Sequence, residues 1–332
     1  MTRIAVIGAG LSGLVVAREL QVDHAVTVFE KSRGVGGRMA TRYESGFEFD
    51  HGAQFFTART SNFREYLQPL IERGIVTSWR ARFAELQRGE IVLQRDWDDT
   101  CPHYVGAPRM NEIGKVLAEN LDVRRNMTVS KLEREQGGWC LSDSGDTDLG
   151  QFDWVILAVP AAQAAALAPA DSSLSRLAGS VKMQACLALL LGFDMPLSLP
   201  WQAALVHGAN ISWVSVNSSK PGRPEPFSLV VHSTNPFADD NIDGDGDDLV
   251  ARMLAETCEV VGVNVDTATL LRLQRWRYAN VDNQNGAGFF VDETIRLAAC
   301  GDWFNRGRVE AAFTSGFSLA RKLARLALVD RH

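Results

Sequence analysis

The sequence predicts an α/β fold of two domains, one built on a parallel sheet and the other on a mixed or antiparallel sheet. Three observations support this prediction. Residues 4–30 read as a strand, a glycine-rich turn, a helix and a second strand. Short β-rich runs dominate residues 180–290. At 332 residues, the chain exceeds the length at which one hydrophobic core stops growing.

The opening segment carries the spacing Gly-x-Gly-x-x-Gly between its first strand and its helix. Gly8 permits a tight turn, Gly10 lets the backbone approach a pyrophosphate, and Gly13 lets the helix pack closely on the sheet. The helix begins at Leu11, followed by Ser12. Free N–H groups and the summed peptide dipoles at this end of the helix favour a bound anion. The pattern therefore predicts a phosphate-binding turn.

The second strand of this segment, Ala25 to Phe29, ends in Glu30 and Lys31. An acid at this place accepts hydrogen bonds from ribose hydroxyls, so Glu30 is the expected ribose ligand. A glycine triplet alone is a weak signal, but here strand, helix, second strand and acid all have the required spacing. We therefore expect a Rossmann-like domain that binds the ADP half of a dinucleotide, rather than a merely structural glycine turn.

The remaining elements follow from hydrophobic periodicity and turn residues. The predicted helices are residues 62–74, 110–120, 249–262 and 310–328. The predicted strands are residues 91–93, 123–133, 139–142, 152–158, 186–192, 211–217, 227–233, 269–278 and 295–300. The last strand and helix return the chain to the first domain. We expect a nucleotide-binding domain of residues 1–57, 108–164 and 291–332, and a substrate domain of residues 58–107 and 165–290.

Composition excludes several classes of protein. With 40 acidic and 34 basic residues, the net charge of −6 argues against a nucleic-acid partner. The 5 cysteines form no C-x-x-C pair, so neither a metal site nor a disulfide framework is indicated. The apolar run 155–170 contains two prolines and is too short to span a membrane. Residues 4–17 match the nucleotide motif rather than a signal peptide. We expect a cytoplasmic protein without a membrane partner.

A second glycine-rich segment, Gly34 to Arg38, follows the acid and precedes Met39. Its glycines expose backbone N–H groups, and Arg38 can make charge-assisted bonds to a phosphate. Residues 30–38 resemble the second half of the FAD signature of the monoamine oxidase superfamily. In that superfamily the glycine pair, which ends at Gly37 here, and the arginine cover the pyrophosphate.

The C-terminal region resembles the same superfamily. The segment Ala299-Cys-Gly-Asp-Trp303 is followed by Val309-Glu-Ala-Ala312. The resemblance implies that Asp302 holds the ribityl or phosphate end of the flavin, and that the next helix points its N-terminus at the isoalloxazine. A helix N-terminus there would stabilise the negative charge of a reduced flavin.

Several passages resemble a narrower group, the renalase-like flavoproteins and in particular their bacterial members. These passages are residues 49–59, 155–160, 217–223, 275–279 and 299–303. The resemblance implies non-covalent FAD and oxidation of NAD(P)H isomers reduced at ring position 2 or 6. Hydride would pass to flavin N5 to give NAD(P)+, and dioxygen would reoxidise the flavin with release of hydrogen peroxide. No cysteine lies between Cys258 and Cys300, which fits non-covalent attachment.

The motifs and the resemblance together define the expected cofactor site. Gly52, Ala53 and Gln54 are expected beneath the flavin because small residues allow close approach. The expected FAD contacts are Gly8, Gly10, Leu11, Ser12, Gly13, Glu30, Lys31, Gly37, Arg38, Met39, Gly52, Ala53, Gln54, Val129, Ala158, Gly301, Asp302, Val309, Glu310 and Ala311.

The substrate site should orient a flat ring. A dihydropyridine that loses hydride becomes an aromatic cation and releases no proton, so the reaction needs no strong base. Asn217 and Gln54 are candidate amide partners for a carboxamide. Each tryptophan can equally be a core residue, and His232 a hydrogen-bonded core histidine. The candidate residues that contact substrate are Trp213, Asn217, His232, Trp276 and Tyr278.

Three other residues near these passages have simpler expected roles. Asp50 is expected to be a backbone or cap partner of the Gly52 turn rather than a catalytic acid. Arg223 and Arg277 are expected either to be solvated or to bind the phosphates of a dinucleotide.

Two other functions stay open. An amine oxidase of the monoamine or polyamine type would keep a lysine near flavin N5, for which Lys182 is the candidate. A binding module of the GDP-dissociation-inhibitor type shares the architecture, although the intact Glu30, Arg38 and Asp302 argue for a bound flavin.

Residues 239–244 match half of a calcium loop, but Val250 stands where the bidentate Glu belongs, which favours a solvated acidic loop.

Overall fold

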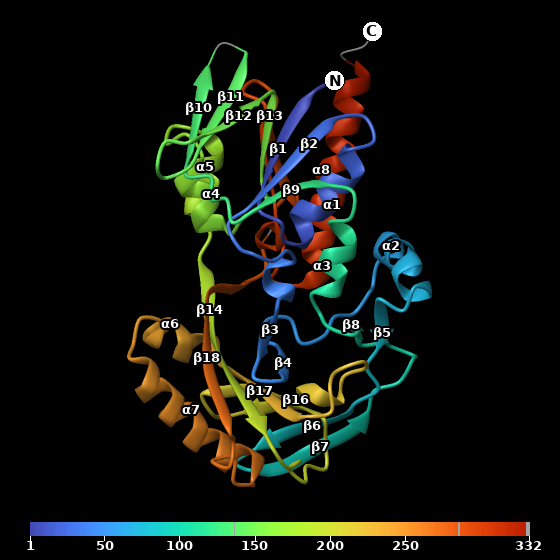
Figure 1. The fold of residues 1–332 in the computed structure, drawn as a ribbon, viewed down its shortest axis with the longest axis vertical. Helices are drawn as coiled ribbons and strands as arrows, with labels where there is room; N and C mark the ends of the chain where they lie inside the picture. The colour runs from blue at the N-terminus through green and yellow to red at the C-terminus, as the bar shows by residue number, and fades with distance from the viewer. Residues whose placement is uncertain (136, 285, 330–332) are drawn as a thin grey trace. The chain divides into compact units, whose positions relative to one another are not determined.

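The computed structural model describes residues 1–135, 137–284 and 286–329 (Figure 1). It divides into two compact units, each assembled from separate stretches of chain. Unit 1 comprises Met1–Gly37, Gly114–Met183 and Val281–His332, and unit 2 comprises Arg38–Ile113 and Gln184–Asn280.

Unit 1 is built on a six-stranded sheet of order β19-β20-β13-β1-β2-β9. Its neighbours pair in parallel except for β19 and β20, which pair antiparallel. The strands are β1 (Arg3–Ile7), β2 (Ala25–Glu30), β9 (Asp122–Arg125), β13 (Trp154–Leu157), β19 (Phe289–Asp292) and β20 (Leu297–Cys300). Consecutive residues of β1 and β13 are buried, as expected for strands covered on both faces. The predicted Rossmann-like α/β domain is confirmed.

Helices α1 (Leu11–Leu20) and α8 (Val309–Val329) pack against each other in unit 1. A Cβ on Gly316 of α8 would lie 2.4 Å from the carbonyl oxygen of Ser12, so only glycine allows this approach. The rest of unit 1 includes a small antiparallel sheet and two short helices. These elements are β10 (Lys131–Glu135), β11 (Gly138–Ser142), β12 (Asp148–Phe152), α4 (Ala161–Leu167) and α5 (Ser173–Gly179). Helix α3 (Glu112–Leu117) begins at the end of one stretch of unit 2.

Unit 2 is built on a seven-stranded mixed sheet of order β18-β14-β17-β16-β15-β6-β7. The pairs β14–β17, β15–β16, β16–β17 and β6–β7 are antiparallel, whereas β15 and β6 pair in parallel. The strands are β6 (Arg82–Gln87), β7 (Glu90–Asp96), β14 (Met183–Phe193), β15 (Ala203–His207), β16 (Ile211–Val216), β17 (Phe227–Ser233) and β18 (Leu270–Val281). The predicted mixed or antiparallel second sheet is confirmed.

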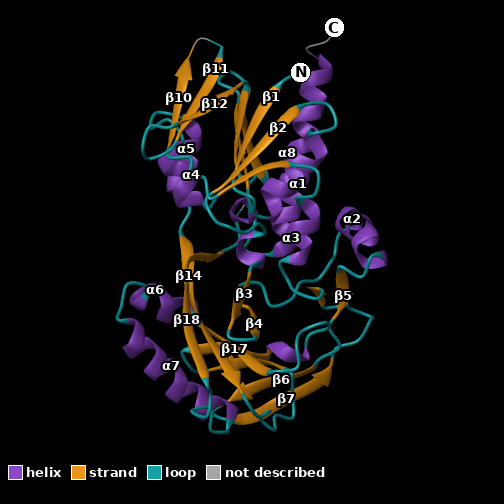
Figure 2. Ribbon diagram, in the orientation of Figure 1, coloured by secondary structure: helices purple, strands orange, loops and turns teal. Residues whose placement is uncertain are grey.

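The two faces of this sheet have different coverings (Figure 2). Helices α6 (Asn235–Asn241) and α7 (Gly246–Val261) cover one face, where Val231 packs in the same core as Leu249. The other face meets the hairpin of β3 (Thr41–Glu44) and β4 (Phe47–Asp50), with Val230 in its apolar cluster. Because side chains alternate along a strand, His232 shares the hairpin face with Val230.

The remaining elements of unit 2 lie on the connections between these strands. They are α2 (Ser61–Glu72), β5 (Val76–Ser78), β8 (Tyr104–Gly106) and the 3-10 turn Asn217–Ser219. Another 3-10 turn, Gly37–Met39, spans the division between the units.

The observed division differs from the expected one at all four boundaries. Residues 38–57 and 108–113 belong to unit 2, and residues 165–183 and 281–290 belong to unit 1. The β3–β4 hairpin packs Phe47 and Phe49 on the second sheet, which draws this stretch into unit 2. Residues of α5 such as Leu174 join the core of unit 1, and β19 adds a strand to its sheet.

Candidate functional site

The glycine turn of unit 1 has the geometry that the motif predicts. Gly8 adopts φ +107°, and a Cβ there would lie 2.5 Å from the carbonyl oxygen of Ala158. A Cβ on Gly13 would lie 2.0 Å from the carbonyl oxygen of Gly8. At Gly10, by contrast, a Cβ would meet nothing within 4 Å among the described residues. Two glycines are thus required by the fold, whereas Gly10 faces open space where a pyrophosphate would fit.

Glu30 is fixed at the carboxyl end of β2. Its Oε2 accepts a hydrogen bond from the Ala9 N–H at 2.9 Å, and its Oε1 accepts one from the Ser32 N–H at 2.8 Å. Each carboxylate oxygen has further lone-pair capacity, so the group fits the expected ribose hydroxyls. The neighbouring Lys31 is exposed.

The second glycine segment lies against the first. The Gly36 N–H donates to the Ala9 carbonyl oxygen at 2.8 Å, and a Cβ on Gly37 would lie 3.2 Å from Gly10 Cα. The structure therefore brings the two motifs together at the carboxyl edge of the sheet, where open α/β sheets bind nucleotides.

The C-terminal segment reaches the same edge. Ala299 of β20 pairs with Leu157 of β13, which places Gly301 and Asp302 beside Ala158 at the carboxyl ends of neighbouring strands. The Gly301 N–H donates to Ser315 Oγ of α8 at 2.9 Å, and Asp302 is buried. The residues Val309, Glu310 and Ala311 form the first turn of α8, and Val129 packs in the core of unit 1.

Other expected cofactor residues lie together in unit 2. The Ala53 N–H donates to the Arg38 carbonyl oxygen at 2.8 Å, and Arg38 Nη1 donates to the Ala279 carbonyl oxygen at 2.9 Å. A Cβ on Gly52 would lie 2.0 Å from the Arg38 carbonyl oxygen, which explains the glycine. Met39 is buried.

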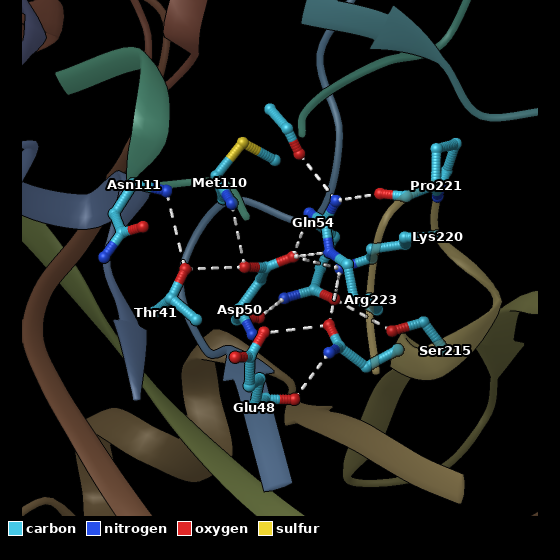
Figure 3. A network of polar contacts seen from close by, with 12 residues as sticks. Thr41, Glu48, Asp50, Gln54, Met110, Asn111, Ser215, Lys220, Pro221 and Arg223 are labelled. Carbon is cyan, nitrogen blue, oxygen red and sulfur yellow. Dashed lines mark hydrogen bonds and ion pairs between the residues drawn. The ribbon is translucent and has the colours of Figure 1, made fainter. Parts of the chain in front are cut away.

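A buried charged cluster, formed by Asp50, Lys220 and Arg223, contacts Gln54 at the end of the 51–54 turn (Figure 3). Asp50 Oδ2 accepts from Arg223 Nη2 at 2.5 Å and from Lys220 Nζ at 3.4 Å. Asp50 Oδ1 accepts from Thr41 Oγ1 at 2.7 Å and from the Met110 N–H at 3.1 Å. All three charged side chains are 1% exposed or less.

This cluster contains more positive than negative charge. Burial alone would raise the pKa of Asp50, but the two cations outweigh it and lower the pKa to about 2. Burial lowers the pKa of Lys220 to about 8, although Asp50 opposes that shift. At neutral pH the cluster holds one negative and two positive charges. The region around Asp50 therefore carries a net positive charge.

The amides of Gln54 and Asn217 are committed to this cluster. Gln54 Oε1 accepts from Lys220 Nζ at 3.1 Å and from Ser215 Oγ at 2.8 Å, while Gln54 Nε2 donates to the Asp50 carbonyl oxygen at 2.5 Å. Asn217 Oδ1 accepts from Lys220 Nζ at 3.0 Å, and Asn217 Nδ2 donates to the Glu48 carbonyl oxygen at 2.8 Å. The two amides thus hold the turn in place.

His232 and Trp276 meet at the His51 carbonyl. His232 Nε2 lies 3.2 Å from this oxygen, and Trp276 Nε1 donates to it at 3.0 Å. The His51 ring stacks on Trp276 with centroids 5.2 Å apart and planes 17° apart. Burial lowers the pKa of both histidines to about 4, so both are neutral near pH 7. Tyr278 is half-buried two residues along β18 from Trp276, on the same face as predicted.

Trp213 lies opposite His232 in the β16–β17 pair. Its indole belongs to an aromatic cluster, with Phe55 at 5.5 Å and Trp97 at 6.4 Å between ring centroids. Among the described residues its Nε1 has no hydrogen-bond partner. The structure thus brings Trp213, His232, Trp276 and Gln54 together on the hairpin face of one sheet.

Sequence reasoning missed Lys220 and misjudged Arg223. Arg223 is neither solvated nor free for a phosphate, because Asp50 and the carbonyl oxygens of Gly106 and Pro221 occupy it. Lysine is among the residues least often buried, so nothing in the local pattern marks Lys220. Lys182 is exposed just before β14, and Arg277 is exposed and pairs with Asp243.

Residues 239–244, which match half of a calcium loop, have other partners in the structure. Asp239 Oδ1 accepts from the Ala185 N–H at 2.7 Å, and Asp243 binds Arg277. No group of three or more His, Cys, Asp or Glu side chains that suits a metal ion occurs in the described part of the chain.

Comparison with known families decides the class of protein. A model of the flavin-containing amine oxidoreductase family matches residues 90–323, and a model of NAD(P)-binding Rossmann-like domains matches residues 6–70. The chain belongs to the flavin-containing amine oxidoreductase family. It is thus a flavin-dependent oxidoreductase, and this membership argues against a binding module without a flavin. No helix in the described ranges is long and apolar enough to cross a membrane.

Individual relatives of this oxidoreductase are distant. A 4,4'-diapophytoene desaturase of Staphylococcus aureus is 40% identical over 77 residues, which cover 20% of this chain and 15% of the desaturase. Among solved structures, reduced UDP-galactopyranose mutase has a TM-score of 0.76 at 10% identity and covers 98% of this chain and 94% of its own. Putrescine oxidase bound to putrescine has a TM-score of 0.70 at 13% identity, covering 98% of this chain and 99% of its own. These structural likenesses show the fold alone.

Proposed function

We propose that this flavin-dependent oxidoreductase holds FAD without a covalent bond and oxidises dihydronicotinamides, the 2- and 6-dihydro isomers of NAD(P). The supporting observation is the chemistry of the 51–54 region. His51 and the adjoining His232 are neutral near pH 7, and the buried Asp50 next to this region is paired with two cations. Such a site lacks a strong base but offers flat rings, which suits hydride loss from a dihydropyridine.

The same region disfavours the amine oxidase alternative. Amine substrates are cationic near neutral pH, and the net positive charge of the buried cluster repels an ammonium group. Lys182, the candidate lysine for an amine oxidase, is exposed. The dihydronicotinamide ring is neutral and its phosphates are anionic, so the cluster favours this substrate class.

The carboxyl edge of unit 1 fits a dinucleotide cofactor. The open space at Gly10 suits a pyrophosphate, and the fixed carboxylate of Glu30 suits a ribose. When bound, the flavin supplies the two-electron acceptor at N5, and dioxygen regenerates it with release of hydrogen peroxide. Burial raises the pKa of the Cys300 thiol to about 12, so Cys300 is a poor nucleophile for covalent attachment.

The residues of unit 2 would orient the substrate. Trp276, stacked on His51 and hydrogen-bonded to its carbonyl oxygen, is held as a flat wall. His232 and Trp213 stand on neighbouring strands of the same sheet face, and Tyr278 extends that face along β18. Their task is to fix the plane and direction of the ring rather than to move a proton.

Product analysis tests the proposal. The purified protein should be yellow, and trichloroacetic acid should release all of its FAD into solution. Under air, each 6-dihydroNAD or 2-dihydroNAD consumed should yield one NAD+ and one hydrogen peroxide. Putrescine and benzylamine should give no peroxide above the rate of a heat-treated sample. Peroxide from amines without peroxide from dihydroNAD isomers would reject the proposal and favour the amine oxidase.

A further inference from the structure

The contacts of His232 fix which ring nitrogen carries its proton. A carbonyl oxygen only accepts hydrogen bonds, and His232 Nε2 lies 3.2 Å from the carbonyl oxygen of His51. A neutral His232 that makes this bond must therefore be protonated at Nε2. Its Nδ1 then bears a lone pair, and Nδ1 has no hydrogen-bond partner among the described residues.

Gln54 is the neighbour that would reverse this arrangement if it turned. Its Nε2 lies 3.4 Å from His232 Nε2, so a spare amide hydrogen there would favour the opposite tautomer. Both hydrogens are in use, because Gln54 Nε2 contacts the carbonyl oxygens of Asp50 at 2.5 Å and Gly52 at 3.1 Å. The orientation of the Gln54 amide thus protects the proton on His232 Nε2.

Lys220 fixes that amide orientation. An ammonium group has three donors, and Lys220 Nζ finds three acceptors in Gln54 Oε1 at 3.1 Å, Asn217 Oδ1 at 3.0 Å and Asp50 Oδ2 at 3.4 Å. If the Gln54 amide flipped, its nitrogen would face the Lys220 ammonium and its oxygen would face two carbonyl oxygens. Both contacts are repulsive, so Lys220 and the peptide carbonyls select one orientation.

We propose that Lys220 is a positioning residue that, through Gln54 and the 51–54 turn, holds His232 as the Nε2–H tautomer and leaves Nδ1 to accept a hydrogen bond from the substrate. The matching substrate group is an N–H donor on a flat ring, such as a carboxamide. This part rests on the proposed function. It also gives the site a partner for a carboxamide N–H, although the Gln54 amide and the Asn217 amide oxygen are occupied by other groups.

Nitrogen NMR of the whole flavin-loaded protein, labelled with 15N-histidine, tests the tautomer directly. At pH 7, His232 should show a protonated Nε2 and an unprotonated Nδ1. Its signals are assigned by their loss in His232→Asn, or, if that variant does not fold, by replacing the other histidines one at a time. An Nδ1–H tautomer or an imidazolium at pH 7 would overturn the proposal.

The Lys220→Met variant tests the positioning role. Asp50 keeps Arg223 as a partner, so the carboxylate stays paired. Removing the ammonium frees the Gln54 amide. It also takes away a positive charge that lowers the pKa of His232. The NMR should then show a mixture of tautomers and a higher titration midpoint for His232. Lys220→Arg should restore the single tautomer, and Lys131→Met, at an exposed site, should change nothing.

A tautomer that is unchanged in Lys220→Met would reject the role of Lys220. If Lys220→Met fails to fold, Gln54→Glu provides a second test. A carboxylate there keeps an acceptor for Lys220 but no longer offers hydrogens to the carbonyls of Asp50 and Gly52, so the His232 signals should again become heterogeneous. Unchanged signals in that variant would count equally against the proposal.

Substrate analogues test Nδ1. Replacing the carboxamide of dihydroNAD by an acetyl group removes the N–H but keeps the carbonyl. The wild-type KM should rise roughly 3- to 10-fold with this analogue, the loss of one neutral hydrogen bond, and His232→Phe should abolish the difference. Equal wild-type KM values would reject the acceptor role and leave the proposed function intact. If neither compound is oxidised, the proposed function fails and the NMR result alone judges the tautomer.

Discussion

The substitution Asp50→Asn tests the buried charged cluster. The new amide keeps one oxygen for Thr41 Oγ1 and the Met110 N–H, but it places N–H groups against Arg223 and Lys220. Two cations, each 1% exposed or less, would then lack a counter-charge. Removing one partner of a buried ion pair costs about 3 to 5 kcal/mol, so the free energy of unfolding of unit 2 should fall by that amount.

Urea unfolding followed by tryptophan fluorescence measures this loss, because Trp79, Trp97 and Trp201 are buried in unit 2. Flavin saturation must be equal in all samples, since bound ligand stabilises the folded state. The matched control is Asp243→Asn, which removes an exposed partner of Arg277 and should change little. The double variant Asp50→Asn/Lys220→Met should recover part of the loss. If Asp50→Asn costs no more than Asp243→Asn, the cluster is not a stabilising ion network and the reasoning is wrong.

Three further predictions concern both units. Gly10→Ala should fold normally but lose flavin, because its Cβ would meet no described protein atom within 4 Å and would enter the space that we assign to the pyrophosphate. Gly13→Ala should lower the thermal midpoint as well, because its Cβ would lie 2.0 Å from a carbonyl oxygen. Flavin content per chain and a melting curve separate the two variants. Glu30→Ala should weaken FAD retention by about 1.5 to 3 kcal/mol for the lost charge-assisted bonds, and an unchanged FAD dissociation constant would contradict the assigned role. The pKa of Lys220 is lowered in the folded protein to about 8. Between about pH 8 and the ordinary pKa of lysine, the unfolded chain therefore binds more protons than the folded protein, and the contribution of Lys220 to stability should rise with pH. Lys220→Met should flatten that rise when the free energy of unfolding is measured in urea at several pH values.

The cofactor side of the fold is readable from sequence because its constraints are local. Gly8 takes a positive φ that favours glycine, and a Cβ on Gly13 would meet the carbonyl oxygen of Gly8 in the same strand–turn–helix unit. Helix α1 begins at the predicted Leu11. Glu30 falls at a fixed distance along the chain from the turn. A pattern in one short segment is enough to predict such a site.

The substrate side depends on contacts that no local pattern records. Asp50 meets Thr41 from a neighbouring strand, Met110 from a later turn and Arg223 from a segment more than a hundred residues away. The sequence predicted His232 and Trp276 as substrate contacts, Asn217 as an amide partner of the substrate, and Gln54 both as such a partner and as a residue beneath the flavin. Their amides instead hold the turn, because a buried lysine claims their oxygens. Which polar groups remain free can be judged only after every hydrogen bond is counted.

Anaerobic stopped-flow mixing tests the central claim most directly. The yellow protein is mixed with 6-dihydroNAD and, separately, with a panel of primary amines and polyamines, and the flavin absorbance is followed. The account predicts rapid bleaching by the dihydronicotinamide, with NAD+ formed in equal amount, and no bleaching by any amine. Bleaching by an amine alone would contradict it.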